Sequence, residues 1–177
     1  MDDLARELGI SKKTIYQYYS DKNALVETIL LKKLEEDQKA CQQFIQESTN
    51  AIQAFMNVIS MVVETMGQIH PSVFYDLQKY HPNAFKIMKD HQVNFVTGMI
   101  QKNVYRGIEE GVYRSELDPG VISRIYVHVV DGIIRREIET VNNKTFSEFF
   151  TEAIQFMIHG MVTEKGRNFL KSQINNQ

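Results

Sequence analysis

One short stretch near the start of the chain carries the side chains best suited to specific chemistry. The spacing predicts a helix over residues 12–19, with Ser11 as a cap for an amide of its first turn and Ile15 on the inward face. The cations, hydroxyls and amide that point mostly outward are Lys12, Lys13, Thr14, Tyr16, Gln17 and Tyr18. Side chains of these types hydrogen-bond base edges and phosphates, so the outward face suits a nucleic-acid groove.

The residues before this helix predict a second, shorter one. Leu4, Ala5 and Leu8 recur at helical spacing, so we expect them on one inward face. Gly9 then ends the helix, because glycine adopts the left-handed C-cap conformation without a steric cost. Two short helices joined by a glycine turn, the second with a polar face, are typical of a helix-turn-helix. The alternative is an ordinary helical hairpin that only contributes to a core.

The stretch LARELGISKKTIYQYYSDKNAL resembles the signature of TetR-family transcriptional regulators. The resemblance lies in the LA-x-x-LG-x-S start, the T-x-Y of the second helix, the aromatic pair Tyr18 and Tyr19, and the D-K before the next helix. The segment GIEEGVYRSELDPG is similar to a second pattern of that family, G-x-x-x-G-x-x-R-x-x-x-D-P. The resemblance implies a protein that binds double-stranded DNA at a palindromic operator.

The resemblance places the DNA-contacting positions on Lys12, Lys13, Thr14, Tyr16, Gln17 and Tyr18, with Lys22 at a phosphate position. Lys12 or Lys13 could donate to guanine, and Gln17 could pair with adenine. The hydroxyls of Thr14 and Tyr16 suit phosphates, which set the register. For Tyr18 two roles stay open, contact with a thymine methyl group or packing. Lys22 adds a charge beside free amides at a helix start.

Proteins that resemble this chain carry another helix ahead of the position of Met1. We therefore interpret the chain as N-terminally truncated, with the first helix of the DNA-binding domain missing; truncation, a wrongly assigned start and disorder of that helix all remain open. We expect the 177-residue form to bind DNA poorly in a gel shift, because two helices bury little apolar surface.

Composition narrows the class of protein. Apolar residues make up 43% of the 177 residues, enough for a packed core, and the net charge of −2 requires any DNA-binding surface to be local. A single cysteine, Cys41, excludes an internal disulfide, and we expect it on the surface as an inert thiol. The sequence lacks a signal peptide and an apolar run of about 18 residues, so we expect a cytoplasmic protein with no membrane partner.

Helical periodicity extends over the rest of the chain, and we expect an all-α protein. The predicted fold is an N-terminal helix-turn-helix followed by a helical-bundle regulatory and dimerisation domain. We expect the DNA-binding region and the start of a linker helix in residues 1–40, and the ligand-binding and dimerisation domain in residues 41–177. A long helix is predicted from Ser20 and Asp21, with Ser20 as its cap, and further helices cover residues 48–66, about 82–105 and 119–140. A helix with Pro71 in its first turn reaches Tyr80, and the last strong helix starts at Thr145 or Ser147 and reaches Met161.

The middle helices are rich in methionine and aromatic residues. The family resemblance implies a small apolar or amphipathic ligand that binds among them and releases the operator, although such residues also fill ordinary cores. The predicted ligand-contacting residues are Phe55, Ile59, Phe74, Tyr75, Met88, His91, Phe95, Tyr126 and Phe150.

The helix predicted after Pro119 is apolar on more than one face between residues 121 and 134, so it needs two burial surfaces. The resemblance implies a homodimer whose last two helices form a four-helix bundle with their partners, with operator half-sites about 34–36 Å apart. The alternative is the central core helix of a monomer. The predicted interface residues are Ile122, Ile125, Val129, Ile133, Phe149 and Phe156.

No catalytic pattern accompanies these features. The five histidines are scattered without metal-ligand spacing, and the chain has no G-x-S-x-G, P-loop or G-x-G-x-x-G motif. We therefore expect no enzyme activity, no cofactor and no metal. The favoured function is a ligand-responsive transcriptional regulator, and a repressor is favoured over an activator. The alternative is a helical dimeric ligand-sensing or scaffold protein without DNA-binding activity.

Overall fold

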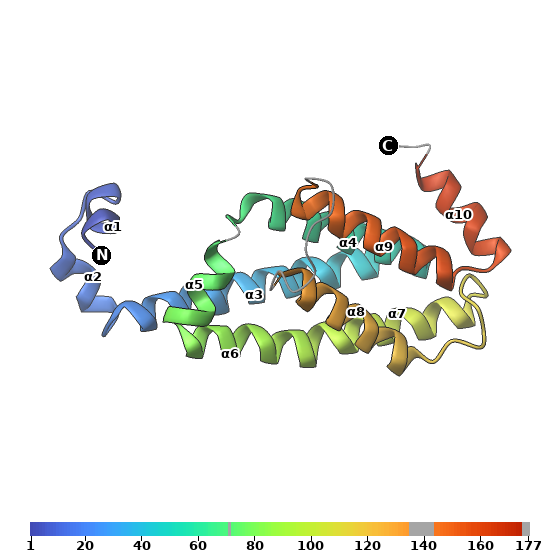
Figure 1. The fold of residues 1–177 in the computed structure, drawn as a ribbon, viewed down its shortest axis with the longest axis horizontal. Coiled ribbons are helices and arrows are strands. Elements are labelled where there is room, and N and C mark those ends of the chain that lie inside the picture. Colours follow the sequence, from blue (N-terminus) through green and yellow to red (C-terminus); the bar gives the residue numbers. More distant parts are fainter. Residues whose placement is uncertain (71, 135–143, 175–177) are drawn as a thin grey trace.

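A computed structural model describes residues 1–70, 72–134 and 144–174, and every regular element in these ranges is helical. The predicted all-α fold is therefore confirmed. The molecule is elongated: a short helical pair lies at one end and a bundle of longer helices forms the rest (Figure 1). In chain order the elements are α1 (Asp2–Glu7), α2 (Lys12–Tyr18), α3 (Lys22–Glu47), α4 (Ala51–Gln68), α5 (Ser72–Tyr80), α6 (Pro82–His91), the π-helical segment η1 (Gln92–Val96), α7 (Thr97–Glu109), α8 (Pro119–Ile134), α9 (Phe146–Met161) and α10 (Glu164–Ile174).

Two separate cores lie along the chain. The small core consists of Ala5, Ile15 and Leu25, with Met1, Leu4 and Tyr19 packed against it. The large core lies among α4, α7, α8 and α9. Helix α3 belongs to both ends of the molecule, because Leu25 is in the small core while Cys41 is buried within the bundle. The helix runs without interruption through residue 40, so the domain boundary placed there stays a prediction.

Side-chain caps mark the helix starts. Ser11, Asp118 and Thr145 cap the helices that follow them, as predicted, and Thr145 forms a reciprocal capping box with Glu148. Two starts differ from the prediction. Asp21 caps α3 in place of Ser20, which the sequence offered as a cap, and Asn50 caps α4, two residues after the predicted start at Ser48.

The helix predicted over residues 82–105 is longer and is not uniform. It continues to Glu109, and η1 interrupts its α-helical geometry between α6 and α7. The predicted loop therefore starts after Gly107, which lies inside α7. Gly111, at φ +68°, makes the left-handed turn that ends this helix.

Gly107 is required by packing rather than by a turn. The backbone amides of Val112 and Tyr113 both donate to its carbonyl at 2.9 Å, which folds the loop back over α7. The Tyr113 ring then lies so close that an added Cβ would stand 2.0 Å from its Cδ2 atom. Tyr113 is almost fully buried, so its ring has no space to move away.

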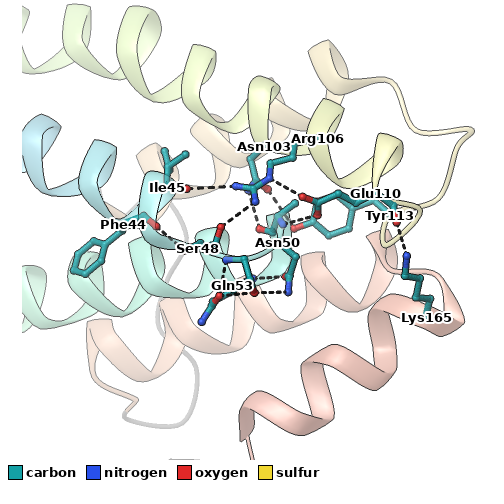
Figure 2. A network of polar contacts seen from close by, with 12 residues as sticks. Phe44, Ile45, Ser48, Asn50, Gln53, Asn103, Arg106, Glu110, Tyr113 and Lys165 are labelled. Carbon is teal, nitrogen blue, oxygen red and sulfur yellow. Dashed lines mark hydrogen bonds and ion pairs between the residues drawn. The ribbon is translucent and has the colours of Figure 1, made fainter.

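A polar network fixes the corner between α3 and α4 onto α7. Arg106 donates to the Glu110 carboxylate at 2.6 Å and to the carbonyls of Ile45 and Ser48 at 3.3 and 3.0 Å (Figure 2). Glu110 in turn accepts from the amide of Ala51 at 2.7 Å, at the first turn of α4. The network thereby satisfies carbonyls at the end of α3 and an amide at the start of α4 that have no partner within their own helices.

The last helix, α10, was not predicted. From the sequence we expect Gly160 and Gly166 to weaken the end of the preceding helix and the closing polar SQINNQ to fray. In the structure Leu170 is buried, and Gly166 lies against the Val112 carbonyl, where an added Cβ would be 2.1 Å from the oxygen. Contacts with a loop some 50 residues away in the sequence stabilise this helix, and local helix propensity does not predict such contacts.

Three residues differ in burial from what the sequence predicted: Leu8 and Ile29 were expected to face inward, and Cys41 was expected at the surface. Leu8 follows the end of α1 and is 59% exposed, and Ile29 on α3 is also 59% exposed. Cys41, expected at the surface, is buried at 4% exposure. Cys41 is buried because α3 packs against α4 and α6. Within the described ranges no helix is both long enough and apolar enough to cross a lipid bilayer.

Replacing Gly107 with alanine should destabilise the protein strongly. The new methyl group would overlap the buried Tyr113 ring, and we expect a loss of about 2–3 kcal/mol of unfolding free energy in urea titrations. Gly98→Ala is the matched control on the same helix, because no atom lies within 4 Å of the added Cβ. That variant should gain roughly 0.5–1 kcal/mol from helix propensity. Equal stability of the two variants would contradict this account.

Candidate functional site

Helix α2 presents its polar side chains away from the protein. Ile15 is buried in the small core, whereas Lys12, Lys13, Tyr16, Gln17 and Tyr18 are exposed. Thr14 is half-buried, because its amide and hydroxyl bond to the Ser11 hydroxyl at 3.0 and 2.8 Å. Tyr18 is 79% exposed, so it does not pack against its own chain. All of the predicted candidates on α2 except Thr14 are thus exposed.

The charges on this face are not equally available. Lys12 forms an ion pair with Asp2 on α1, and this hydrogen bond is the main reason that the pKa of Asp2 is lowered. Lys13 has no carboxylate partner among the ion pairs of the described residues. Lys22 is exposed at the first position of α3, directly after the capping residue Asp21. Lys13 and Lys22 are therefore the better placed cations for an external phosphate.

A cavity of about 240 Å³ lies inside the bundle, enclosed by α3 to α6, η1, α7, α8 and α9. Its wall is mainly aliphatic, aromatic and sulfur-containing. Six of the nine predicted ligand-contacting residues line it: Phe74, Met88, His91, Phe95, Tyr126 and Phe150. These residues come from five different elements, so the tertiary fold brings them together.

The other three predicted ligand residues lie outside the cavity lining. Phe55 and Ile59 are buried in the large core, and the Phe55 ring contacts Tyr126 edge-on at 6.2 Å between centroids. Tyr75 is exposed on α5, where its hydroxyl accepts a hydrogen bond from Lys79 at 2.9 Å. Phe55 therefore supports the wall from behind, and Tyr75 faces solvent.

Helix α3 supplies a part of the wall that the sequence prediction missed. The contributing residues are Leu30, Lys33, Leu34, Asp37 and Cys41. Their signal was present as an apolar stripe at helical spacing, but that stripe was interpreted only as the packing face of a linker. Burial raises the pKa of the Cys41 thiol to about 11, so the thiol is protonated at neutral pH.

His91 is the unusual polar group in this wall. Its Nε2 atom is buried without a hydrogen-bond partner, and its ring stacks on Phe95 with 5.1 Å between centroids. Burial lowers the pKa of His91, while the negative charge of Asp37 acts in the opposite direction. The imidazole is accordingly neutral at physiological pH.

A second cavity, of about 390 Å³, lies on the other side of η1 and α7, against the C-terminal half of α3. Its wall is rich in amides and cations and includes Gln42, Gln46, Asn103 and Lys102. Phe95 and Met99 line both cavities, so these two side chains form part of the partition between an apolar and a polar space.

The predicted interface residues divide into exposed and buried groups. Phe156 on α9 is 83% exposed and Ile125 on α8 is 45% exposed, while Val121, one turn before Ile125, is also exposed. Ile122, Val129 and Phe149 are partly buried against the large core, and Ile133 is fully inside it. Helix α8 therefore buries one apolar face within the chain and leaves Val121 and Ile125 exposed, and a second burial surface for this helix stays a prediction. The residues of the predicted helix beyond 134 lie outside the described part up to residue 143.

These features define an all-α fold with an N-terminal helix-turn-helix and a bundle of longer helices. Residues 1–29 match the family described as bacterial regulatory proteins, tetR family. No curated protein matches the sequence of the chain at a significant level.

Solved structures share the fold over most of the chain. A TetR-family transcriptional regulator from Agrobacterium tumefaciens is 12% identical, with a TM-score of 0.73 over 92% of this chain and 86% of the other. The ketosteroid transcriptional regulator KstR2 of Mycobacterium tuberculosis is 17% identical, with a TM-score of 0.66 over 92% and 84%. FadR from Bacillus subtilis, solved in complex with stearoyl-CoA, is 15% identical, with a TM-score of 0.66 over 90% and 87%. The matched segment and the shared fold agree, because these structures include a regulator described as a TetR-family protein.

Acidification should cost the wild-type protein more stability than it costs a His91→Gln variant. The pKa of His91 is lower in the folded protein than its ordinary value of 6.5, so between these two values the unfolded chain binds more protons. The contribution of the neutral ring to the free energy of unfolding is complete above pH 6.5 and declines as the pH falls toward the folded-state pKa. Urea unfolding at pH 7.5 and 5.5 measures the difference, and identical pH dependence of both proteins would contradict it.

Proposed function

We propose that this protein is a ligand-responsive repressor that binds a palindromic operator as a homodimer. In this proposal α2 enters the major groove, α8 and α9 pair with a second copy, and a small apolar or amphipathic ligand in the cavity controls DNA affinity. The observation that carries the proposal is the exposed polar face of α2 within a segment that matches the tetR family.

The exposed positions of Lys13, Gln17 and Tyr18 support base contacts from α2. Recognition helices of helix-turn-helix proteins place such side chains against base edges, while residues at the margin contact phosphates. Lys22 suits a phosphate, because it lies at the start of α3, where free amides and the helix dipole favour an anion.

The exposed apolar residues on α8 and α9 support an interface with a second copy. Phe156 and Ile125 would otherwise remain in water, and large exposed apolar residues on neighbouring helices are typical of interaction surfaces. A twofold dimer would present two copies of α2 to one face of the DNA. Binding through two copies would be stronger than binding through one, which matters because each N-terminal helical pair carries few cations.

Helix α3 supports a link between the cavity and the DNA-binding end. Leu30, Leu34 and Cys41 line the cavity, and Lys22 begins the same helix. A second connection lies at the α5–α6 junction, where the His81 ring nitrogen and the Asn23 side chain are 2.6 Å apart. A ligand with different affinities for two positions of α3 would shift the spacing of the two heads. The bound stearoyl-CoA of Bacillus subtilis FadR indicates that this fold can accommodate a long apolar chain.

Enrichment of binding sites from a random duplex library tests the proposal directly. We expect the protein to select a sequence with two inverted half-sites, and the bound complex to contain two copies of the chain. Low salt makes weak binding measurable, because phosphate contacts strengthen as the ionic strength falls. Failure to enrich any sequence, together with salt-independent or absent DNA binding, would reject the proposal.

Lys22→Ala and Gln17→Ala should separate affinity from sequence preference. We expect Lys22→Ala to weaken binding to all duplexes alike, because phosphate contacts are independent of sequence, and to reduce the salt dependence. Gln17→Ala should lose about 1–3 kcal/mol of discrimination at a single base pair. Fluorescence-anisotropy titrations with the enriched site and its single-base variants measure both effects. Uniform weakening by both substitutions would contradict this division of roles.

Phe156→Asp should convert the dimer into single subunits. The carboxylate would have to be buried without a partner at the interface, so we expect at least a tenfold rise in the dimer dissociation constant by analytical ultracentrifugation. Ile29→Asp is the control, because Ile29 is also exposed but lies on α3. Dissociation by the control to the same extent would contradict an interface centred on α9.

A further inference from the structure

We propose that the cavity binds an uncharged, mainly hydrocarbon molecule with one hydroxyl or carbonyl group, and that His91 hydrogen-bonds this group. The inference rests on the ligand-binding part of the proposed function and specifies the ligand class. It excludes free carboxylates and amines of similar shape as preferred ligands.

The wall of the cavity favours a hydrocarbon body. Three faces of the lining are apolar: Val58, Met61, Val62 and Met66 from α4, Val73, Phe74 and Leu77 from α5, and Val127 and Val130 from α8. An apolar molecule in this space exchanges water contacts for contacts with these side chains, which is the main source of affinity in such pockets. Several of the residues are methionines, whose flexible side chains adapt to an irregular chain.

The charges in the lining are already compensated. Lys33 and Asp37 are the two residues with full charges in the described wall, and they pair with each other at 2.8 Å between Nζ and Oδ1. Neither partner is free to neutralise a ligand charge without losing its own. A carboxylate or ammonium group in the cavity would therefore lose its hydration without gaining a counter-ion.

His91 supplies the polar contact. It lines the cavity, and its buried Nε2 atom has no hydrogen-bond partner among the residues that the structure describes. Because burial lowers the pKa of this ring, it stays neutral and offers one donor and one acceptor nitrogen. A hydroxyl or carbonyl group that reaches the ring would satisfy a nitrogen that the fold leaves unpaired. The stack on Phe95 holds the imidazole plane and thereby limits the direction from which a ligand can approach.

A matched series of eight-carbon probes tests the ligand class. 1-Octanol, octanoate and octylammonium are titrated at pH 7.5 against the wild-type protein loaded with the fluorescent apolar dye N-phenyl-1-naphthylamine. We expect 1-octanol to displace the dye at a concentration at least tenfold lower than either charged probe. Equal or stronger displacement by octanoate or octylammonium overturns the proposal, and so does failure of 1-octanol to displace the dye below its solubility limit.

Two substitutions test the role of His91. In His91→Leu the preference for 1-octanol over 1-chlorooctane should disappear, while dye binding persists because the cavity remains apolar. In His91→Gln, which keeps a donor and an acceptor, the preference should be retained at least in part. Retention of the full preference in His91→Leu would overturn the assignment to His91. If His91→Leu fails to fold, His91→Met takes its place: loss of the preference for 1-octanol in His91→Met supports the role of His91, and retention of the full preference overturns it.

A further measurement separates the proposed ligand class from the proposed control of DNA binding by a ligand. DNA binding is measured with the enriched operator in the presence and absence of 1-octanol. Octanol binding without any change in DNA affinity would retain the cavity assignment and reject ligand control of the operator. Operator binding with no octanol binding would retain the DNA-binding part of the proposed function and reject the ligand class proposed for the cavity.

Discussion

The continuity of helix α3 is the constraint on which the rest of the structure depends. A single 26-residue helix has its first turns in the small N-terminal core and its later turns in the wall of the cavity. Because a helix transmits displacement along its axis with little bending, the position of Lys22 depends on how the bundle packs around Leu34 and Cys41. The polar network of Arg106 fixes the far end of α3 to α7, so movement caused by a ligand would be expressed at the free end, which carries the helical pair.

The cavity combines an apolar interior with an internal balance of charge. Lys33 and Asp37 neutralise each other, and Lys89 and Asp131 form another ion pair between α6 and α8. Buried or half-buried charges that are paired do not attract a charged ligand, because breaking the pair leaves one member uncompensated. The partition formed by Phe95 and Met99 separates this space from a polar cavity that is lined by amides. The π-helical segment η1 carries Phe95, and such segments often occur at functional sites.

The outer surface carries a polar face on α2 and exposed apolar residues on α8 and α9. Helix α2 exposes lysine, glutamine and tyrosine side chains, which suits a hydrated and charged partner such as DNA. Helices α8 and α9 expose Ile125 and Phe156, which suits a dry contact with another apolar surface. The N-terminal pair has a modest cationic character, which the ion pair between Lys12 and Asp2 reduces further. In the proposed dimer, two such pairs in one assembly would compensate for the weak electrostatic attraction of each.

Local sequence determined the helix-turn-helix, because Gly9, the Ser11 cap and the inward Ile15 act within a few residues of one another. The two-sided pattern of α8 was likewise visible at helical spacing. Only the tertiary structure decided which aromatic residues line the cavity: Phe74 and Phe95 do, while Phe55 lies behind the wall and Tyr75 faces solvent. The burial of Cys41 and the existence of α10 were also beyond the sequence. Helical periodicity reports which face of a helix is apolar, but the packing of distant helices decides what that face contacts.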